Sequence, residues 1–312
     1  MSDLLFAANT VLPLLLLMSA GFLSRRIGLL NDSLVKGINQ LIFKLFLPIN
    51  LFMSVLGTPA DTKIEGKEFL FVFFGLIVLF LLFMLLVPRI EKDRAKVGVM
   101  IQGMGRANYA FFGIPLVKML FPGQDTSLAA LLVTVTVPVY NVMSVIALSA
   151  FNGNKVNIKK ILLNILKNPL IIASLLGYAC WLMKLQLPSF LNTTFSDMAK
   201  VATPLALFTL GGAITLQSAF RHKKQLIISV LGKLILSPIL FLSLAVALGI
   251  RGVGLACVLI SFGAPTAVSS YPMAQQMGGD GELAAEIVAM TSTCSIVTTF
   301  LFVFLLKTLA LI

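Results

Sequence analysis

The chain has 312 residues, of which 58% are hydrophobic and only 12% are charged. This balance excludes an ordinary soluble domain and is typical of a protein that crosses a membrane several times. The net charge of +12 does not indicate a nucleic-acid partner, because lysine and arginine also gather in the cytoplasmic loops of membrane proteins.

Ten apolar segments are long enough to cross a bilayer, which requires about 20 residues each. The predicted spans are approximately 4–24, 34–56, 68–88, 96–120, 127–150, 164–184, 200–219, 225–249, 252–277 and 284–310. If the N-terminus lies outside, the cytoplasmic loops hold about twice as many lysine and arginine residues as the external ones. We therefore expect a plasma-membrane protein with both termini extracellular, although the last cytoplasmic loop, residues 278–282, is acidic.

Similar short segments recur in the two halves of the chain. Gly21-Phe22 matches Gly177-Tyr178, and the segment from Pro48 to Phe52 matches the segment from Pro204 to Phe208, both at an offset of 156 residues. Because each half has an odd number of spans, the second half enters the membrane in the opposite sense. The sequence thus predicts an all-α membrane protein with two inverted five-helix repeats, residues 1–152 and 153–312.

The fourth and ninth spans both contain a Phe-Gly-x-Pro motif, at residues 112–115 and 262–265. Glycine and proline together weaken a helix, so we expect breaks at Gly113–Pro115 and Gly263–Pro265, near mid-membrane. In an inverted repeat the two broken helices cross, and their half-helix N-termini favour an anion. A single motif of this kind would favour a structural proline kink in the helix. A symmetric pair of motifs favours a binding site.

Polar and charged side chains near these breaks are the candidate binding residues. Asn108, Asn141, Asn50 and Thr266 offer amides and a hydroxyl that could bind a carboxylate or a small cation, or join helices to one another. The three deep cations are Lys44, Arg106 and Lys233, and no carboxylate lies deep in any span. Lys233 could snorkel to the interface, whereas Arg106 and Lys44 are better placed to bind substrate.

Other kinds of site have no support in the sequence. The three cysteines, Cys180, Cys257 and Cys294, lie in apolar stretches, and His222 lies in a basic loop with no partner residue. Metal-ligand clusters, phosphate-binding glycine loops and nucleophile triads are missing. We therefore expect no enzyme activity, no metal and no cofactor.

Three motifs resemble those of the auxin efflux carrier family, which includes bacterial malonate and malate permeases and the plant PIN carriers. They are NYAFFGIPL at residues 108–116, GVGLACVLISFGAP at 252–265 and PMAQQ at 272–276. The resemblance covers nearly the whole chain. It implies a scaffold of spans 1, 2, 6 and 7 and a transport domain of spans 3–5 and 8–10. It also implies substrate binding at Asn108 and a homodimer formed through the scaffold, at spans 2 and 7.

The expected function is secondary active transport of a small organic anion, such as malate or malonate, by an elevator-like mechanism. The expected coupling ion, if there is one, is either sodium or a proton. The alternative is a sodium-coupled symporter of the bile-acid-carrier type, which shares the crossed-helix architecture. A membrane sensor or channel is a third possibility, which the absence of saturable counterflow would indicate.

Overall fold

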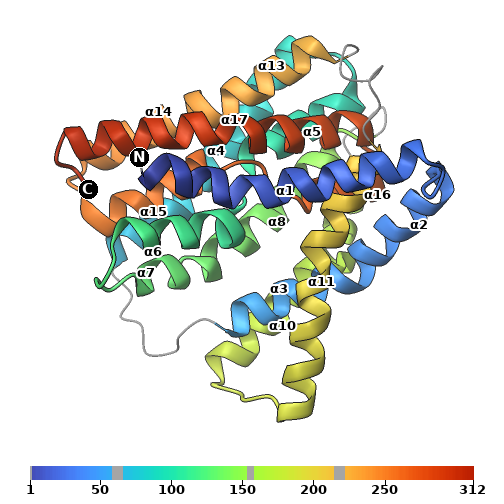
Figure 1. Ribbon diagram of the computed structural model, residues 1–312, viewed down its shortest axis with the longest axis horizontal. Helices are drawn as coiled ribbons and strands as arrows, with labels where there is room; N and C mark the ends of the chain where they lie inside the picture. Colours follow the sequence, from blue (N-terminus) through green and yellow to red (C-terminus); the bar gives the residue numbers. More distant parts are fainter. Residues whose placement is uncertain (1, 58–65, 153–157, 214–221) are drawn as a thin grey trace.

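The computed structural model describes residues 2–57, 66–152, 158–213 and 222–312, and these ranges are helical (Figure 1). The helices of the first half are α1 (Ser2–Arg26), α2 (Asp32–Leu41), η1 (Ile42–Phe46), α3 (Leu47–Leu56), α4 (Gly66–Ile90), α5 (Arg94–Gly105), η2 (Tyr109–Gly113), α6 (Ile114–Leu120), α7 (Ser127–Leu131) and α8 (Val133–Ala150). The helices of the second half are α9 (Ile158–Lys167), α10 (Pro169–Leu182), α11 (Ser189–Ala213), α13 (Lys223–Leu231), η3 (Gly232–Leu236), α14 (Ser237–Ala247), α15 (Gly252–Gly263), α16 (Ser270–Gln276) and α17 (Gly281–Thr308). The all-α class expected from the sequence is confirmed over the described ranges.

Five of the described helices are long and apolar enough to cross a membrane. They cover Asp32–Leu56, Gly66–Ile90, Ser127–Ala150, Lys223–Ala247 and Gly281–Thr308. Shorter apolar helices cover Tyr109–Leu120, Pro169–Leu182 and Gly252–Gly263. The chain is therefore a multi-pass membrane protein, while the count of ten spans and their inverted arrangement stay predictions.

The π-helical segments η1, η2 and η3 share one feature, which is that each ends two residues before a proline. Proline lacks the N–H that would bond the carbonyl four residues earlier, and its ring clashes with that carbonyl. A π-turn, with bonds spanning five residues, accommodates both effects without ending the helix. At Pro115 this is visible in the backbone N–H of Ile114, which bonds the carbonyl of Tyr109.

This local geometry corrects one expectation from the sequence. The chain remains helical through Gly113 and Pro115, and the break in this span lies earlier, at residues 106–108 between α5 and η2. In the other motif the break lies where it was expected, because α15 ends at Gly263 and α16 begins only at Ser270.

Very close helix packing joins α1 to α11 and α3 to α10. A Cβ placed on Gly21 of α1 would lie 1.8 Å from the carbonyl oxygen of Phe208 in α11. A Cβ on Gly177 of α10 would lie 3.0 Å from the carbonyl oxygen of Phe52 in α3. Glycine is required at such approaches because any side chain would push the backbones apart.

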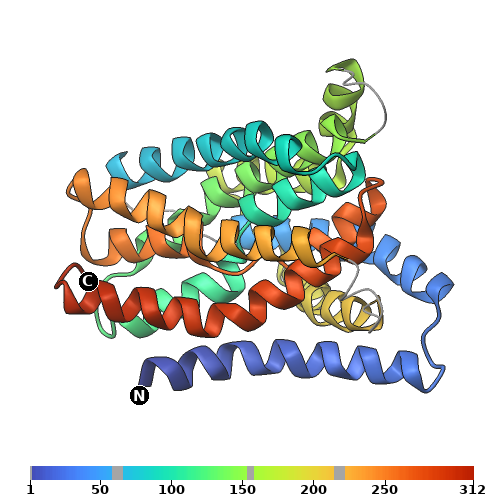
Figure 2. The same ribbon diagram turned by 90° about the horizontal axis from the view of Figure 1, so that it is seen from above.

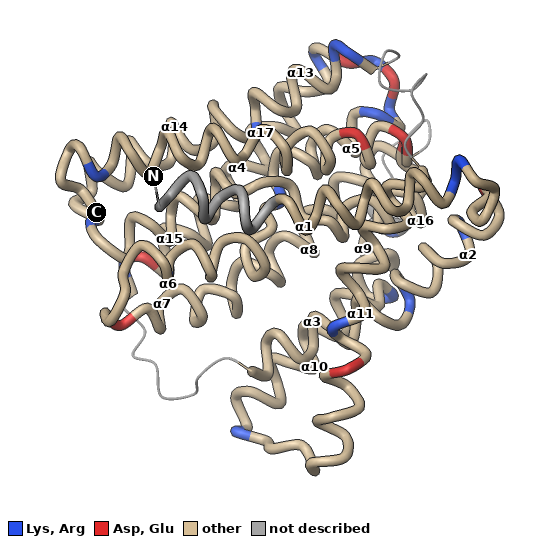
Figure 3. Tube along the Cα trace, viewed as in Figure 1, with Lys and Arg blue, Asp and Glu red and all other residues tan. Residues whose placement is uncertain are grey.

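The remaining helices enclose the breaks. Residues 97–105 of α5 and residues 254–263 of α15 are all buried. Figure 2 shows α1 along one edge of the molecule, where it contacts α11 and α17. Charged residues gather where α1 ends and where α5 and α13 begin, and the middle stretches of the helices are almost free of them (Figure 3). The two breaks therefore lie inside an apolar, helix-lined interior.

Candidate functional site

The two helix breaks meet side by side. The backbone N–H of Asn108 donates a hydrogen bond of 2.7 Å to the carbonyl of Pro265, and Ala107 forms an antiparallel β-bridge with Thr266. Two extended segments from different halves of the chain are thus paired in the interior. The pairing gives hydrogen-bond partners to backbone groups that the breaks would otherwise leave unsatisfied. In apolar surroundings an unsatisfied backbone group is especially costly in free energy.

Thr266 supplies further bonds that hold the pairing together. Its hydroxyl donates to the carbonyl of Gly103 at 2.7 Å, and its N–H donates to the hydroxyl of Thr291 in α17 at 3.2 Å. The Gly103 carbonyl belongs to the last turn of α5, where helix carbonyls lack intrahelical donors. Thr266 is fully buried, and its hydroxyl faces the backbone of α5 and not the pocket described next.

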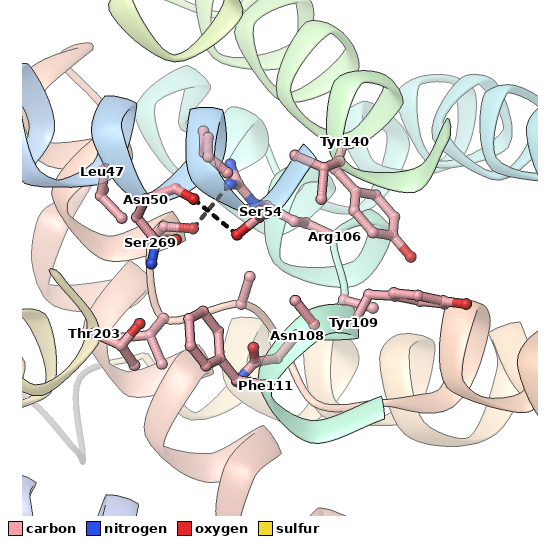
Figure 4. A pocket seen from close by; sticks show the side chains of 16 residues that line it. Leu47, Asn50, Ser54, Arg106, Asn108, Tyr109, Phe111, Tyr140, Thr203 and Ser269 are labelled. Carbon is pink, nitrogen blue, oxygen red and sulfur yellow. Dashed lines mark hydrogen bonds between the residues drawn. The ribbon is translucent and has the colours of Figure 1, made fainter. Parts of the chain in front are cut away.

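A pocket lies beside the paired breaks, between them and the helices α3 and α11 (Figure 4). Its lining residues are Leu47, Asn50, Leu51, Ser54, Arg106, Ala107, Asn108, Tyr109, Ala110, Phe111, Val137, Tyr140, Thr203, Ala267, Val268 and Ser269. Most of this wall is apolar, with a few converging polar groups, which is the usual make-up of a small-molecule site. Three of the residues predicted from the sequence line it, namely Asn50, Arg106 and Asn108.

Arg106 brings a positive charge into the pocket wall. The residue is 3% exposed, and its guanidinium donates to the hydroxyl of Ser269 at 2.8 Å and lies 3.0 Å from the sulfur of Met273. Over the described part of the chain no carboxylate pairs with it. A guanidinium has five N–H donors in a fork that fits a carboxylate, so several donors remain for a ligand. The pocket is therefore suited to an anion.

The two asparagines of the pocket differ in how they are engaged. Asn50 donates its amide to the carbonyl of Ala199 in α11 at 2.9 Å, which ties α3 to α11. The side-chain amide of Asn108 has no hydrogen-bond partner among the described residues, although it is only 5% exposed. Because Asn108 lines the pocket, its amide can donate to a ligand there. Asn108 is thus the better placed of the two to bind substrate directly.

Two tyrosines form ring walls of the same pocket. The hydroxyl of Tyr140 donates to the carbonyl of Ser261 at 2.7 Å, and that of Tyr109 donates to the carbonyl of Ala129 at 3.0 Å. Figure 4 shows the Tyr140 hydroxyl directed away from Arg106. Because both hydroxyls are engaged elsewhere, these residues contribute mainly the apolar parts of their side chains to the pocket wall.

The other predicted site residues lie outside the pocket. Asn141 is fully buried and faces α10, where its amide lies 3.3 Å from the hydroxyl of Ser174. Lys44 is exposed on the outer face of η1. Gly113, Pro115 and Gly263 lie in helices, and Pro265 contributes the backbone carbonyl that accepts from Asn108. Of these residues, only Pro265 contacts a pocket residue, through its backbone carbonyl, and none of them lines the pocket with Arg106, Asn108 and Asn50.

Several pocket residues were not predicted. Ser269, one of these, accepts a hydrogen bond from the Arg106 guanidinium. Thr203 lines the pocket opposite Leu47, and the two are 156 residues apart, each directly before a proline. The repeat offset relates these two positions, but neither of them was a predicted site residue. Ser54 and Tyr140 carry no comparable signal in the sequence.

The sequence suggested that His222 has no partner residue, but the structure places two carboxylates beside it. It is 2% exposed, its Nδ1 lies 3.2 Å from the Glu286 carboxylate, and its Nε2 lies 3.5 Å from the Asp280 carboxylate. Glu286 is 4% exposed near the start of α17. These contacts join residues 58 or more positions apart, which no local pattern could show. No metal-binding cluster is found in the described residues, this group included.

Comparison with known proteins places the chain among membrane carriers. The family model for membrane transport proteins matches residues 6–303. The chain belongs to this family. This confirms the resemblance to auxin efflux carriers, and it identifies the protein as a membrane transporter and not an enzyme.

The curated relatives are distant but match over nearly their whole length. A "Putative malonate transporter" of Rhizobium meliloti (strain 1021) is 23% identical over 309 residues, which cover 96% of either chain. "Uncharacterized transporter YfdV" of Escherichia coli (strain K12) is 21% identical over 313 residues, covering 93% of this chain and 96% of the relative. "Uncharacterized transporter MJ1031" of Methanocaldococcus jannaschii is 23% identical over 299 residues, covering 92% and 95%.

Proposed function

We propose that this transporter is a secondary active carrier of a small organic anion, a mono- or dicarboxylate such as malonate or malate. The observation that carries the proposal is the buried Arg106 guanidinium in the pocket wall, with no carboxylate paired to it among the described residues. Asn108 adds an amide without a partner in the same wall. A carboxylate ligand would satisfy both groups at once. The name of the Rhizobium relative is consistent with this substrate class.

Equivalent contacts in the two halves support an inverted ten-helix repeat. Gly21 packs on the Phe208 carbonyl, and Gly177 packs on the Phe52 carbonyl. Adding the offset of 156 to Gly21 and Phe52 gives Gly177 and Phe208. One contact is therefore converted into the other by exchanging the repeats, which is the relation expected for a pseudo-two-fold axis in the membrane plane.

The position of the pocket supports an elevator-like mechanism. Asn50 and Thr203 come from α3 and α11, which belong to the proposed scaffold, whereas Arg106 and Ser269 come from the proposed transport domain. A substrate held at the paired breaks would move with the transport domain past the scaffold. Asn39 of α2 bridges the same boundary, because it donates to Gln275 of α16 and accepts from Thr209 of α11, each at 2.8 Å.

The remaining parts of the proposal concern assembly and orientation. We propose a plasma-membrane homodimer formed through spans 2 and 7, with both termini outside. The lysine and arginine residues gathered where α1 ends and where α5 and α13 begin support this orientation, because these parts of the helices would face the cytoplasm (Figure 3). The homodimer follows from the family resemblance.

Counterflow in proteoliposomes tests the substrate class. Vesicles loaded with unlabelled malonate are diluted into a trace of radiolabelled malonate, and a carrier then accumulates label transiently against its gradient. We expect saturable counterflow that unlabelled malate inhibits and that malonamide, the neutral diamide, does not. Equal inhibition by malonamide would reject the anion assignment. Label entry without transient accumulation would indicate a channel. Repeating the assay with and without sodium separates the proposal from the sodium-coupled alternative.

A further inference from the structure

A second cavity, of about 420 Å³, shares no lining residue with the Arg106 pocket. Two residues beyond its lining residue Gly278, the N–H of Asp280 bonds the carbonyl of Ala95 near the start of α5. The cavity therefore lies at the end of the molecule where lysine and arginine residues gather (Figure 3). Its volume is in the range of small-molecule sites. Its lining residues are Phe43, Asn152, Asn164, Lys167, Asn168, Pro169, Gln276, Met277 and Gly278.

The wall of this cavity is polar and carries a positive charge. Four of its side chains are carboxamides, Lys167 supplies an ammonium group, and no carboxylate lines it in the described part of the chain. The amide of Asn152 donates to the Met277 carbonyl at 2.7 Å, and the amide oxygen of Asn168 accepts from the backbone N–H of Leu170 at 2.9 Å. Further donors of the carboxamides and the ammonium group are available to a ligand. The cavity therefore suits an anion that carries additional polar groups.

The helix that carries Lys167, α9, is amphipathic. Asn164 and Lys167 line the cavity, whereas Leu162, Leu163 and Leu166 are exposed, Leu166 to 72%. At about 100° per residue the three leucines share one face of the helix, and Leu163 lies one turn before Lys167, beside it on the helix surface. A polar ligand in the cavity and an apolar chain along the leucines would thus meet at Leu163 and Lys167.

The helix α9 lies across the long helices and not along them. Figure 2 shows it as the yellow-green helix that projects from the body of the molecule, transverse to α4 and α17. The chain turns at Pro169, where the side chain of Asn168 caps α10. At the equivalent place in the first half, 156 residues earlier, Leu12 cannot cap and α1 continues through Pro13. A transverse helix with leucines on one face and lysines but no acidic residues is typical of a helix at the membrane interface.

We propose that this cavity binds the head group of an anionic phospholipid. The lipid phosphate accepts from the Lys167 ammonium group, the head-group hydroxyls bond the carboxamides, and an acyl chain runs past Leu163 into the bilayer. The lining residues come from η1, α9, α10 and the ends of α8 and α16, so the lipid links both halves of the chain and stabilises the fold. A free phosphate ion would satisfy Lys167 but would leave the leucine face uncovered. This inference goes beyond the proposed function and does not depend on the transported substrate.

Thermal unfolding of the purified full chain in dodecyl maltoside tests the proposal, with dioleoyl phosphatidylglycerol compared with dioleoyl phosphatidylcholine. At phosphatidylglycerol about 100-fold above its dissociation constant, we expect a midpoint about 4 °C higher than with the same concentration of phosphatidylcholine. Lys167→Gln should weaken the apparent affinity for phosphatidylglycerol by about tenfold or more, and Lys167→Arg should retain it. Lys159→Gln is the matched control, because Lys159 is exposed on the same helix but does not line the cavity, and should also retain it.

Inorganic phosphate and Leu163→Ser distinguish a lipid from a free anion. Inorganic phosphate at the same concentration should not raise the midpoint, and Leu163→Ser should weaken the affinity for phosphatidylglycerol. Equal midpoints with the two lipids in wild type, or a difference that persists in Lys167→Gln, would reject the proposal. A rise with inorganic phosphate that Leu163→Ser leaves unchanged would assign the cavity to a free anion and overturn the lipid assignment. Malonate takes no part in these measurements, so a failure of the proposed substrate would leave their outcome unaffected.

Discussion

Thr266→Val tests whether this residue supports the paired breaks or binds substrate. Valine keeps the shape of threonine but removes the hydroxyl that donates to the Gly103 carbonyl at 2.7 Å. That carbonyl belongs to the last turn of α5 and is left without this donor in a fully buried place. An unsatisfied buried acceptor costs about 1–3 kcal/mol, so we expect a loss of about 2 kcal/mol in the free energy of unfolding.

The expected shift in melting temperature follows from chain length. With an unfolding entropy of about 2.1 cal/mol/K per residue, a loss of about 2 kcal/mol lowers the midpoint by about 3 °C. The assay is thermal unfolding of the purified protein, with malonate affinity measured on the folded fraction. Thr293→Val is the matched control, because the Thr293 hydroxyl is exposed and bonds the carbonyl four residues earlier in its own helix. We expect little change in the control.

The combination of stability and affinity decides the role of Thr266. A supporting role predicts lower stability with malonate affinity changed by less than about threefold, since the hydroxyl does not face the pocket. Unchanged stability together with a loss of affinity of about tenfold or more would refute this reasoning and return Thr266 to the substrate-binding residues.

Three further predictions concern the pocket, the helix packing and the orientation. Asn108→Ala should weaken malonate binding by about 1–2 kcal/mol without lowering thermal stability, because its amide has no partner within the described ranges; unchanged binding would reject its role. Gly21→Ala should destabilise the protein by more than about 1 kcal/mol, since a Cβ would lie 1.8 Å from the Phe208 carbonyl oxygen, whereas Gly37→Ala, with nothing within 4 Å, should be neutral or stabilising. A single cysteine at the exposed position Asn152 should react with an impermeant maleimide only from the cytoplasmic side, and labelling from outside would invert the topology.

Backbone chemistry in the sequence pointed to the neighbourhood of the candidate pocket. Two Gly-x-Pro motifs at matching places predicted paired helix breaks, and both breaks lie within ten residues of those motifs. The first break was displaced because a π-turn lets the helix continue through Pro115. The offset of 156 relates Gly21 to Gly177 and Phe52 to Phe208. It does not predict that each glycine packs against a phenylalanine carbonyl of another helix.

Side-chain direction was much harder to predict. Asn141 and Tyr140 are adjacent in α8, yet only Tyr140 lines the pocket, because successive helix positions point about 100° apart. Lys44 and Lys233 occupy similar places before a proline, yet one is exposed and the other fully buried. The surrounding helices determine these differences, and hydrophobic periodicity gives little guidance when nearly every position is apolar.

The central claim is that Arg106 binds the carboxylate of the substrate, and malonate affinity in two charge-removing variants tests it most directly. Arg106→Gln should weaken binding by about 2 kcal/mol, or about 30-fold, because a charge-assisted hydrogen bond in a buried site is lost. Lys44→Gln removes a cation that is exposed on η1, outside the pocket, and should leave affinity unchanged. Equal affinity in Arg106→Gln and wild type, with both proteins folded, would contradict the account and leave Arg106 as a structural partner of Ser269.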